Sequence, residues 1–165
     1  ARALGVTMIG TVGSDEKATI SLDHDCAHTI VYTRENFVER VPEITGGKGV
    51  PVVYDSIGKD TFPASLDCLS PRGLFVSFGA SSGPIAAFNI GLLAPRGSLY
   101  VTRPPLFTYP APRADLLAMA DDMFALVLAG KIKSEARQTF ALKDAADAHR
   151  ALESRKTTGA TVLIP

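Results

Sequence analysis

The feature of this sequence that most constrains its fold is a regular alternation of strand-like and helix-like runs. Helical segments of about ten residues between short β-branched runs are typical of βαβ units, whose right-handed crossovers build a parallel sheet covered on both faces. Val52-Val53-Tyr54 and Leu74-Phe75-Val76 are almost continuous apolar runs, as strands buried on both faces should be. The sequence therefore predicts an α/β fold with a Rossmann-like, doubly wound parallel sheet. The expected strands are residues 6–12, 29–32, 52–56, 74–79 and 99–103, with helices at 37–44 and 62–69.

The end of the chain continues this alternation. A helix is expected over 114–129, a strand over 138–142, a helix over 144–154 and a strand over 160–164. In the first of these helices the apolar residues recur at helical spacing, which predicts a stripe that packs into a core. The stripe consists of Leu116, Leu117, Met123, Phe124 and Val127.

Length and charge exclude several classes of protein. A chain of 165 residues that is 46% hydrophobic can bury a core as one domain. Its 17 basic and 17 acidic residues predict no electrostatic attraction to nucleic acid or to a membrane surface. No apolar run reaches the length of about 18 residues that a membrane span needs, and no charged leader precedes an apolar signal core. We therefore expect a soluble cytoplasmic protein that binds neither nucleic acid nor membrane.

The two cysteines do not suggest a disulfide or a metal site. Cys26 and Cys68 lie in different βα units and lack CxxC spacing, so both are predicted to be small buried hydrophobic residues. His24 and His28 stand near Cys26, but loops often carry such residues, and we predict no metal ligands. Asp25, at the turn before residue 29, is expected to adopt a left-handed conformation.

A strand end that runs into a helix start, Gly10-Thr11-Val12-Gly13-Ser14-Asp15-Glu16-Lys17, is the best candidate for a ligand site. Gly13 supplies a turn, and Ser14 with Asp15 can cap the helix. In the dinucleotide fold, a carboxylate at this strand tip would hold the ribose 2′-hydroxyl of NAD. The tip here is Gly13, and Ser14 and Lys17 suit a 2′-phosphate, so the corner favours NADPH, although the neighbouring acidic residues soften that preference. An ordinary solvated helix start is the alternative.

No glycine-rich phosphate loop is present in the sequence. No GxGxxG occurs, and Thr45-Gly46-Gly47-Lys48-Gly49 lacks both the spacing of a P-loop and the Ser or Thr after its lysine, so it predicts a helix end and a turn. The chain opens at Ala1-Arg2-Ala3 without an initiator Met, in a pattern like the last turn of a helix. We therefore expect the first strand and the glycine-rich loop of the fold to lie upstream.

Several ordered motifs give the sequence a resemblance to a known family. With these motifs and its ending, the chain resembles the zinc-free, zeta-crystallin-like NADPH:quinone oxidoreductases of the medium-chain dehydrogenase/reductase superfamily over essentially its whole length. The motifs are Gly10-Thr11-Val12-Gly13, Glu43-Ile44-Thr45-Gly46-Gly47-Lys48, Val53-Tyr54-Asp55-Ser56-Ile57-Gly58, Ser77-Phe78-Gly79-Ala80-Ser81-Ser82 and Gly97-Ser98-Leu99-Tyr100-Val101-Thr102-Arg103-Pro104.

The resemblance implies that the chain is the C-terminal part of a longer enzyme. Residues 1–135 would form a partial dinucleotide-binding domain, and residues 136–165 would pack back on a catalytic domain that precedes them. The implied reaction is hydride transfer from NADPH to a quinone, and we name no catalytic residue in this segment. The strand over 98–103 would be a sheet edge through which two copies form a homodimer.

The resemblance also implies which residues contact the cofactor. Gly13, Ser14 and Lys17 would meet the adenosine 2′-phosphate, and Tyr32 would lie by the adenine. Farther along the sheet edge, Ser56, Phe78, Gly79, Ser81, Arg103 and Pro104 would line the cofactor toward its nicotinamide, and Arg155 would help to hold it.

Each of these assignments has a purely structural alternative. Tyr32 can pack on a neighbour, Ser56 can bond nearby backbone, and Phe78 can belong to the core. Lys17 can be a surface lysine, and Arg155 can be a cation that favours a helix C-terminus. For the whole protein the alternatives are an enoyl reductase or another zinc-free medium-chain reductase, or a non-enzymatic nucleotide-binding or self-associating module.

Overall fold

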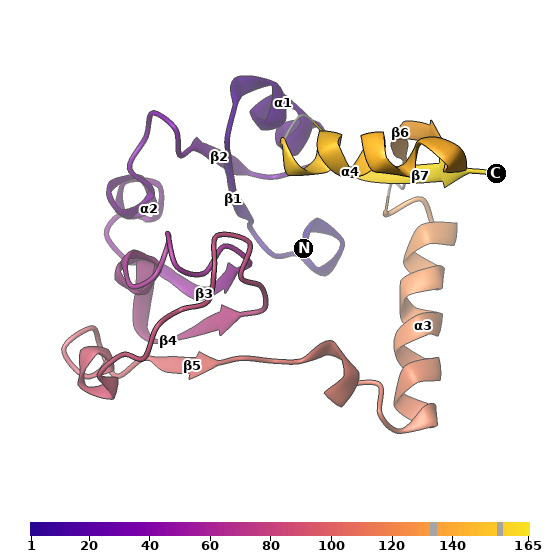
Figure 1. The fold of residues 1–165 in the computed structure, drawn as a ribbon. Coiled ribbons are helices and arrows are strands. Elements are labelled where there is room, and N and C mark those ends of the chain that lie inside the picture. The colour runs from indigo at the N-terminus through magenta and orange to yellow at the C-terminus, as the bar shows by residue number, and fades with distance from the viewer. Residues whose placement is uncertain (133–134, 155–156) are drawn as a thin grey trace. The chain divides into compact units, whose positions relative to one another are not determined.

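The computed structural model describes residues 1–132, 135–154 and 157–165 of the chain (Figure 1). These residues divide into two compact units, Ala1–Ala120 and Asp121–Pro165. We describe each unit by itself.

The first unit contains the predicted βα alternation. Its strands are β1 (Ile9–Val12), β2 (His28–Val31), β3 (Val50–Asp55), β4 (Leu69–Ser77) and β5 (Tyr100–Thr102), and its helices are α1 (Asp15–Asp23) and α2 (Phe37–Thr45). Short 3₁₀ segments connect them, among them η2 (Ala64–Cys68). Every strand pair within the unit is parallel, which confirms the predicted fold class (Figure 1).

The parallel strands form two sheets rather than one. β1 pairs with β2 in one sheet, and β3, β4 and β5 follow one another in the second. Within the described residues, β1 and β3 do not pair with each other. Each therefore keeps one edge on which no ladder is formed.

Local sequence explains where helices begin and end. The side chain of Ser14 accepts a hydrogen bond from the Lys17 amide and caps α1, as predicted. Asn36 caps α2 in the same way, through the Val38 amide. Gly46 ends α2 in a left-handed conformation, and Asp25 adopts the left-handed conformation expected of the turn after α1. The two N-caps fix loops that leave β1 and β2, and the turns at Asp25 and Gly46 lead into β2 and β3.

Most elements begin or end within two residues of the predicted positions, and three differences are larger. β1 begins at Ile9 rather than at residue 6, and β4 begins at Leu69 rather than at residue 74. The run 62–69 does not form an α-helix; its middle part is the 3₁₀ segment η2. Pro63 disfavours helical backbone at Phe62, which explains why the predicted helix does not begin at residue 62.

Two clusters of buried side chains hold the first unit together. Leu66, Leu69, Phe75 and Leu99 form one, and Ile30, Val41 and Cys68 form the other. Val50 and Val53 of β3 pack against both clusters. The clusters therefore connect β2 and α2 to the three-stranded sheet, and they fix the positions of the strand ends.

The helix α3 (Arg113–Leu128) crosses the boundary between the units. None of its residues is buried, so the prediction that its apolar stripe packs into a core is wrong for the described chain. Alanine and leucine occur on every side of this helix, and the sequence therefore does not define one buried face.

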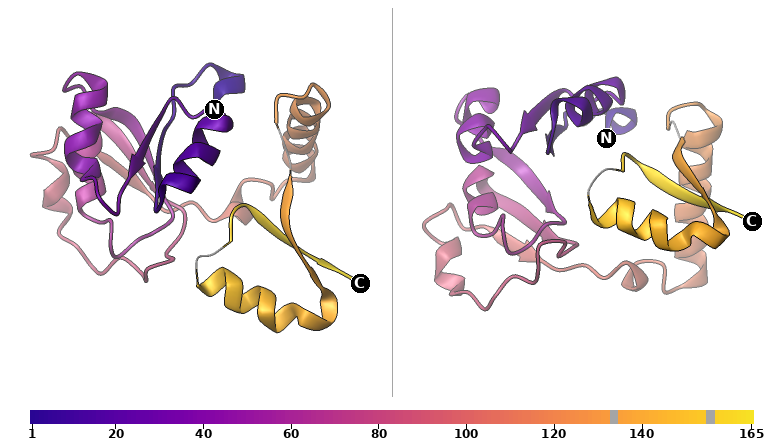
Figure 2. Two further views of the ribbon diagram at one scale, coloured as in Figure 1. Left: turned by 90° about the horizontal axis from the view of Figure 1, so that it is seen from above. Right: turned by 45° about the horizontal axis from the view of Figure 1, so that its top comes forward.

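The second unit contains β6 (Ala136–Ala141), α4 (Ala145–Glu153) and β7 (Ala160–Ile164). β6 and β7 are parallel, and α4 lies alongside them (Figure 2). The amide of Gln138 donates to the carbonyl and the hydroxyl oxygens of Thr158, at 2.8 and 2.9 Å. This side chain fixes the turn into β7.

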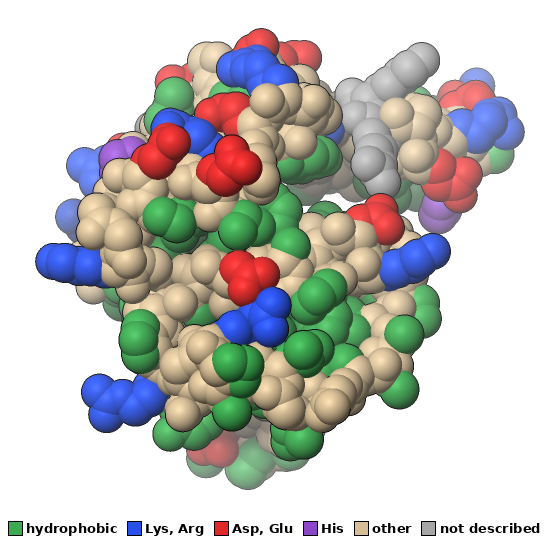
Figure 3. All heavy atoms as spheres, turned by 90° about the vertical axis from the view of Figure 1, so that its left-hand side faces the viewer, with side chains coloured by type: hydrophobic (Ala, Val, Ile, Leu, Met, Phe, Trp, Pro, Cys, Tyr) green, Lys and Arg blue, Asp and Glu red, His purple; other side chains and the backbone are tan. Residues whose placement is uncertain are grey.

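The surface agrees with the balanced composition. On the face shown in Figure 3, basic and acidic side chains are interspersed among apolar ones. Over the described residues, no helix is both long enough and apolar enough to span a bilayer.

Candidate functional site

The candidate site residues form two groups in the first unit, both at carboxyl ends of parallel strands. Gly13, Ser14, Lys17 and Tyr32 follow β1 and β2. Ser56, Phe78, Gly79, Ser81, Arg103 and Pro104 follow β3, β4 and β5. This is the edge at which open α/β sheets receive ligands. Arg155 lies outside the described residues, so its assignment remains a prediction.

The corner between β1 and α1 places two polar groups at a helix start. Ser14 is the N-cap of α1, and its hydroxyl lies 3.3 Å from the Lys17 amide nitrogen. The backbone N–H groups of a first helical turn favour an anion such as a phosphate. The corner therefore combines a hydroxyl, a lysine and the positive end of a helix dipole.

Arg34 is a cation at this corner that the sequence did not reveal. Its guanidinium pairs with the Asp15 carboxylate at 2.5 Å, and that hydrogen bond raises the pKa of Arg34 above its ordinary value. The pair offsets the negative charge that Asp15 brings to the start of α1. Arg34 lies in the loop after β2, with nothing in its sequence spacing to link it to residue 15.

Gly13 and Tyr32 are in direct contact across the ends of β1 and β2. A Cβ atom on Gly13 would lie 2.8 Å from the Tyr32 hydroxyl oxygen. The Tyr32 amide donates to the Val12 carbonyl at 3.0 Å, which fixes the start of the loop, and the residue remains 44% exposed. The ring therefore lies against the bare strand tip while one side stays open to a ligand.

The loops after β3 and β4 are joined backbone to backbone. The Ser81 amide donates to the Ser56 carbonyl at 3.0 Å, and the Ser82 amide donates to the Ile57 carbonyl at 2.9 Å. A Cβ on Gly79 would lie 2.6 Å from the Ser56 carbonyl oxygen, so a residue with a side chain would force the loops apart. Gly79 is therefore a packing glycine that brings Ser56 and Ser81 together.

Phe78 is not part of the core. It is 54% exposed, and its ring meets the Tyr54 ring edge-on with the centroids 6.3 Å apart. Phe78 therefore does not belong to the core of the described residues, and its ring is accessible at the sheet edge.

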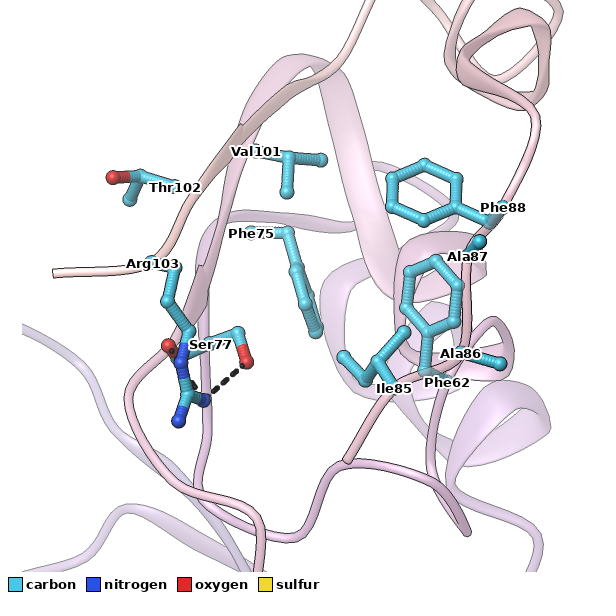
Figure 4. Close-up of a pocket in the computed structure, with 10 residues that line it drawn as sticks. All are labelled: Phe62, Phe75, Ser77, Ile85, Ala86, Ala87, Phe88, Val101, Thr102 and Arg103. Atoms are coloured by element: carbon cyan, nitrogen blue, oxygen red, sulfur yellow. Dashed lines mark hydrogen bonds between the residues drawn. The ribbon is translucent and has the colours of Figure 1, made fainter. Parts of the chain in front are cut away.

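Arg103 lies beyond β5 and connects the third strand end to the second. Its Nη1 donates to the Gly79 carbonyl at 2.8 Å. The same nitrogen donates to the Ser77 hydroxyl at 3.0 Å (Figure 4). Arg103 and Ser77 form the polar end of a cavity of about 390 Å³. Phe62, Phe75, Ile85, Phe88 and Val101 form its apolar wall.

Asp55 is a polar residue of the site that the sequence analysis did not single out. It is the last residue of β3, only 4% exposed, and its carboxylate accepts four hydrogen bonds from the segment that follows. A charged residue that ends an apolar strand is the signal in the sequence that could have identified it.

Cys68 is buried, as predicted, whereas Cys26 is only partly buried and lies within reach of the His28 carbonyl. Burial, with a smaller contribution from Asp67, raises the pKa of the Cys68 thiol to about 11. The described residues contain no cluster of His, Cys, Asp and Glu that could hold a metal ion.

The residues present fit a dinucleotide. Gly13 at the tip of β1 has no side chain, and the atoms nearest to it belong to the Tyr32 ring. The glycine at position 79 lets the loops after β3 and β4 approach each other, which leaves an extended polar backbone edge. A nucleotide phosphate suits the first group, and the rest of a bound cofactor suits the second.

Comparison with known proteins points in the same direction. The family described as zinc-binding dehydrogenase matches residues 24–163. A quinone oxidoreductase from Pseudomonas aeruginosa is 54% identical over the whole chain, and a 2-haloacrylate reductase from a Burkholderia species is 48% identical. The crystal structure of Escherichia coli quinone oxidoreductase complexed with NADPH aligns over the whole chain with a TM-score of 0.94 and 50% identity.

The chain spans about half the length of the curated relatives it matches. It covers 51% of the Pseudomonas aeruginosa protein, 50% of the Burkholderia protein and 51% of the Escherichia coli chain in the crystal structure.

Proposed function

Since the chain belongs to the zinc-binding dehydrogenase family, we propose that it is the NADPH-binding part of a quinone oxidoreductase. The observation that carries the proposal is its 54% identity, over its full length, to a quinone oxidoreductase. The bare strand tip at Gly13, beside Ser14 and Lys17, supports NADPH rather than NADH.

The proposed role of the chain is to bind and orient the cofactor. Ser14 and Lys17 hold the 2′-phosphate, and the ring of Tyr32 lies against the adenine. Ser56, Ser81 and the exposed Phe78 line the path toward the nicotinamide, and Arg103 with Pro104 lies close to that ring. NADPH supplies the hydride when it is bound, and the protein supplies orientation and exclusion of water.

We propose that the remaining parts of the enzyme come from sequence upstream of this chain. A first strand with a glycine-rich loop would complete the pyrophosphate site, and a catalytic domain would cover the nicotinamide. Residues 136–165 would pack on that domain, and Arg155 would contact the cofactor from this segment. The half-length match to the relatives supports this division.

A homodimer through the edge of β5 is a further part of the proposal. β5 pairs with β4 on one side only in the described residues, and Tyr100 and Val101 of this strand are 61% and 38% exposed. Pairing of two such edges would satisfy the open backbone groups of both copies. Sedimentation of the full-length gene product tests this part, with monomers as the contradicting result.

We also propose that the enzyme works without zinc and acts in the cytoplasm. Cys26 lies between α1 and β2, whereas Cys68 lies in η2, and this separation supports the first part of the proposal. Metal analysis of the purified full-length product tests it: less than one zinc atom per chain is expected, and stoichiometric zinc that activity requires would overturn it.

A second candidate is the reduction of an activated carbon–carbon double bond. It rests on the 48% identity over the whole chain to a 2-haloacrylate reductase. Steady-state rates with a benzoquinone and with 2-chloroacrylate, measured on the same preparation, separate the two reactions. A higher kcat/KM for the quinone supports the first candidate, and the reverse supports the second.

Calorimetric titration with NADPH and NADH tests the cofactor assignment. We expect the full-length product to bind NADPH more tightly than NADH, by about tenfold or more, because one charge-assisted contact to a phosphate contributes roughly 1.5 kcal/mol or more. Equal affinity for the two cofactors would contradict the proposed NADPH preference.

A further inference from the structure

We infer that Asp55 is a positioning residue for the cofactor edge: its carboxylate fixes the turn over 56–58, and through that turn the loop over 79–83. The functional part of this inference rests on the proposed function. The structural part rests on the contacts of one buried side chain.

The Asp55 carboxylate is fully occupied by groups of the segment that follows it. Oδ1 accepts from the Ile57 and Gly58 amides at 2.8 and 2.9 Å. Oδ2 accepts from the hydroxyls of Thr61 and Ser65 at 2.6 and 3.0 Å. The carboxylate thus ties the chain leaving β3 to the start of η2 through four donors.

The turn held in this way is the support of the neighbouring loop. The Ser56 and Ile57 carbonyls accept from the Ser81 and Ser82 amides, and the Ser82 hydroxyl also donates to the Ile57 carbonyl at 2.8 Å. The Lys59 amide donates to the Gly83 carbonyl at 3.1 Å. A shift of the turn would therefore move Ser56 and Ser81 together.

Two glycines make this arrangement sensitive to small shifts. A Cβ on Gly58 would lie 2.5 Å from the Gly83 carbonyl oxygen, and one on Gly79 would lie 2.6 Å from the Ser56 carbonyl oxygen. Apart from the Ser82 hydroxyl, the hydrogen bonds named here between the two loops join backbone to backbone. At Gly58 and Gly79 the backbones approach so closely that a small shift of one loop displaces the other.

Arg103 extends the same unit to the third strand. Its Nη1 donates to the Gly79 carbonyl at 2.8 Å, at the beginning of the loop that the turn supports. The backbone ends of β3, β4 and β5 are thus connected in series, with Asp55 as the buried member. Burial of a carboxylate is costly unless its oxygens accept hydrogen bonds. The donors to Asp55 all come from residues 57–65, the segment that follows β3.

The test uses the full-length gene product and three variants. Asp55→Ala removes all four acceptor contacts. Asp55→Asn keeps an acceptor for the two turn amides, and its NH₂ can donate to the two hydroxyls. Thr45→Val is the matched control, because the Thr45 hydroxyl accepts from the Gly49 amide at 3.0 Å and holds the turn at the other end of β3.

Two quantities are measured at a temperature at which every variant is folded. Hydrogen exchange of the Ile57, Gly58, Ser81 and Ser82 amides reports on the loops, and calorimetric titration with NADPH reports on the site. For Asp55→Ala we expect faster exchange at both loops and about tenfold weaker NADPH binding, because loss of one or two hydrogen bonds to the cofactor costs about that much. Asp55→Asn should restore most of both properties, and Thr45→Val should change neither.

The outcomes separate this inference from the proposed function. If the unmodified protein does not bind NADPH, the proposed function fails, while the exchange rates still decide whether Asp55 holds the loops. If NADPH binds and Asp55→Ala weakens binding no more than Thr45→Val does, the inference is overturned. Should Asp55→Ala not fold, the double variant Thr61→Val with Ser65→Ala replaces it, and unchanged exchange at the Ser81 and Ser82 amides would overturn the inference.

Discussion

At the scale of single residues, the shape of the corner after β1 depends on the contact between Gly13 and Tyr32. The Tyr32 hydroxyl oxygen occupies the space that any side chain at position 13 would enter. A side chain at position 13 and the Tyr32 ring would therefore compete for the same space. The choice of cofactor at this corner therefore depends on both residues.

Gly13→Asp is expected to weaken NADPH binding without creating tight NADH binding. The new carboxylate repels the 2′-phosphate, and it cannot settle where it would hold a ribose hydroxyl while Tyr32 occupies that space. The double variant Gly13→Asp with Tyr32→Ala should bind NADH more tightly than the single variant. Dissociation constants for both cofactors check this, and tight NADH binding by Gly13→Asp alone would contradict it.

Lys17→Ala is expected to weaken NADPH binding by about tenfold to a hundredfold and to leave NADH binding nearly unchanged. The reason is the loss of one charge-assisted contact to the 2′-phosphate, worth roughly 1.5–3 kcal/mol. Lys48→Ala is the matched control, because Lys48 lies in the turn before β3, at the opposite end of that strand from Ser56. Equal losses for the two cofactors would assign Lys17 a structural role instead.

Cys68 should make the protein less stable as the pH rises from about 8.5 to about 11. Burial raises the thiol pKa to about 11, whereas an unfolded chain loses this proton near pH 8.5. Between these values the folded state binds more protons, so rising pH favours unfolding, by an amount of the order of 2 kcal/mol. Denaturant unfolding of the protein and of Cys68→Ala at both ends of this range isolates the effect, and parallel pH profiles would refute it.

Residues whose role is local could be read from the sequence. The Ser14 cap, the left-handed Asp25 and the helix end at Gly46 each depend on neighbours a few positions away. Asp55 and Arg34 act through partners that only the fold brings near them. For these two residues, the sequence shows the charge but not what it contacts.

At the scale of elements, the central strands were predictable because their apolar runs are almost continuous. The predicted alternation gave the parallel pairing correctly, although only the 3₁₀ segment η2 lies between β3 and β4. The segment over 62–69 was not predicted correctly, since its apolar content resembles that of a helix while Pro63 disfavours helical backbone at Phe62. The helix α3 shows the reverse case: its helical conformation was predicted correctly, but apolar spacing alone did not establish that its stripe is buried.

The open edges of β1 and β3 lead to a prediction about the strand we propose to lie upstream. In the dinucleotide fold the first strand lies between the strands that correspond to these two. The amides of β1 and β3 should therefore exchange more slowly in the full-length product than in the chain alone. The amides of β4, which already pairs on both sides, should change little and serve as the internal control. Unchanged exchange at β1 and β3 would mean that no strand enters between them.

At the scale of the whole molecule, the two groups of site residues suit the two ends of a dinucleotide. Neither group supplies contacts for the pyrophosphate in between. Gly13, Ser14 and Lys17 suit the adenosine phosphate, and the clamped loops after β3 and β4 suit the nicotinamide half. The pyrophosphate between them needs a helix N-terminus with a glycine-rich loop, and none of the described helices supplies one. Affinity for a dinucleotide requires these contacts to act together on one molecule.

The chain alone should therefore bind NADPH weakly and transfer hydride to a quinone at least about a thousandfold more slowly than the full-length product, because the reacting groups are not held together. Circular dichroism of the chain controls for folding, and addition of the separately expressed upstream segment should recover part of the activity if the two associate. Rates of NADPH oxidation with a benzoquinone measure all three samples. Full activity of the chain alone would mean that it contains a complete site, and that the residues which hold the pyrophosphate lie among those described here.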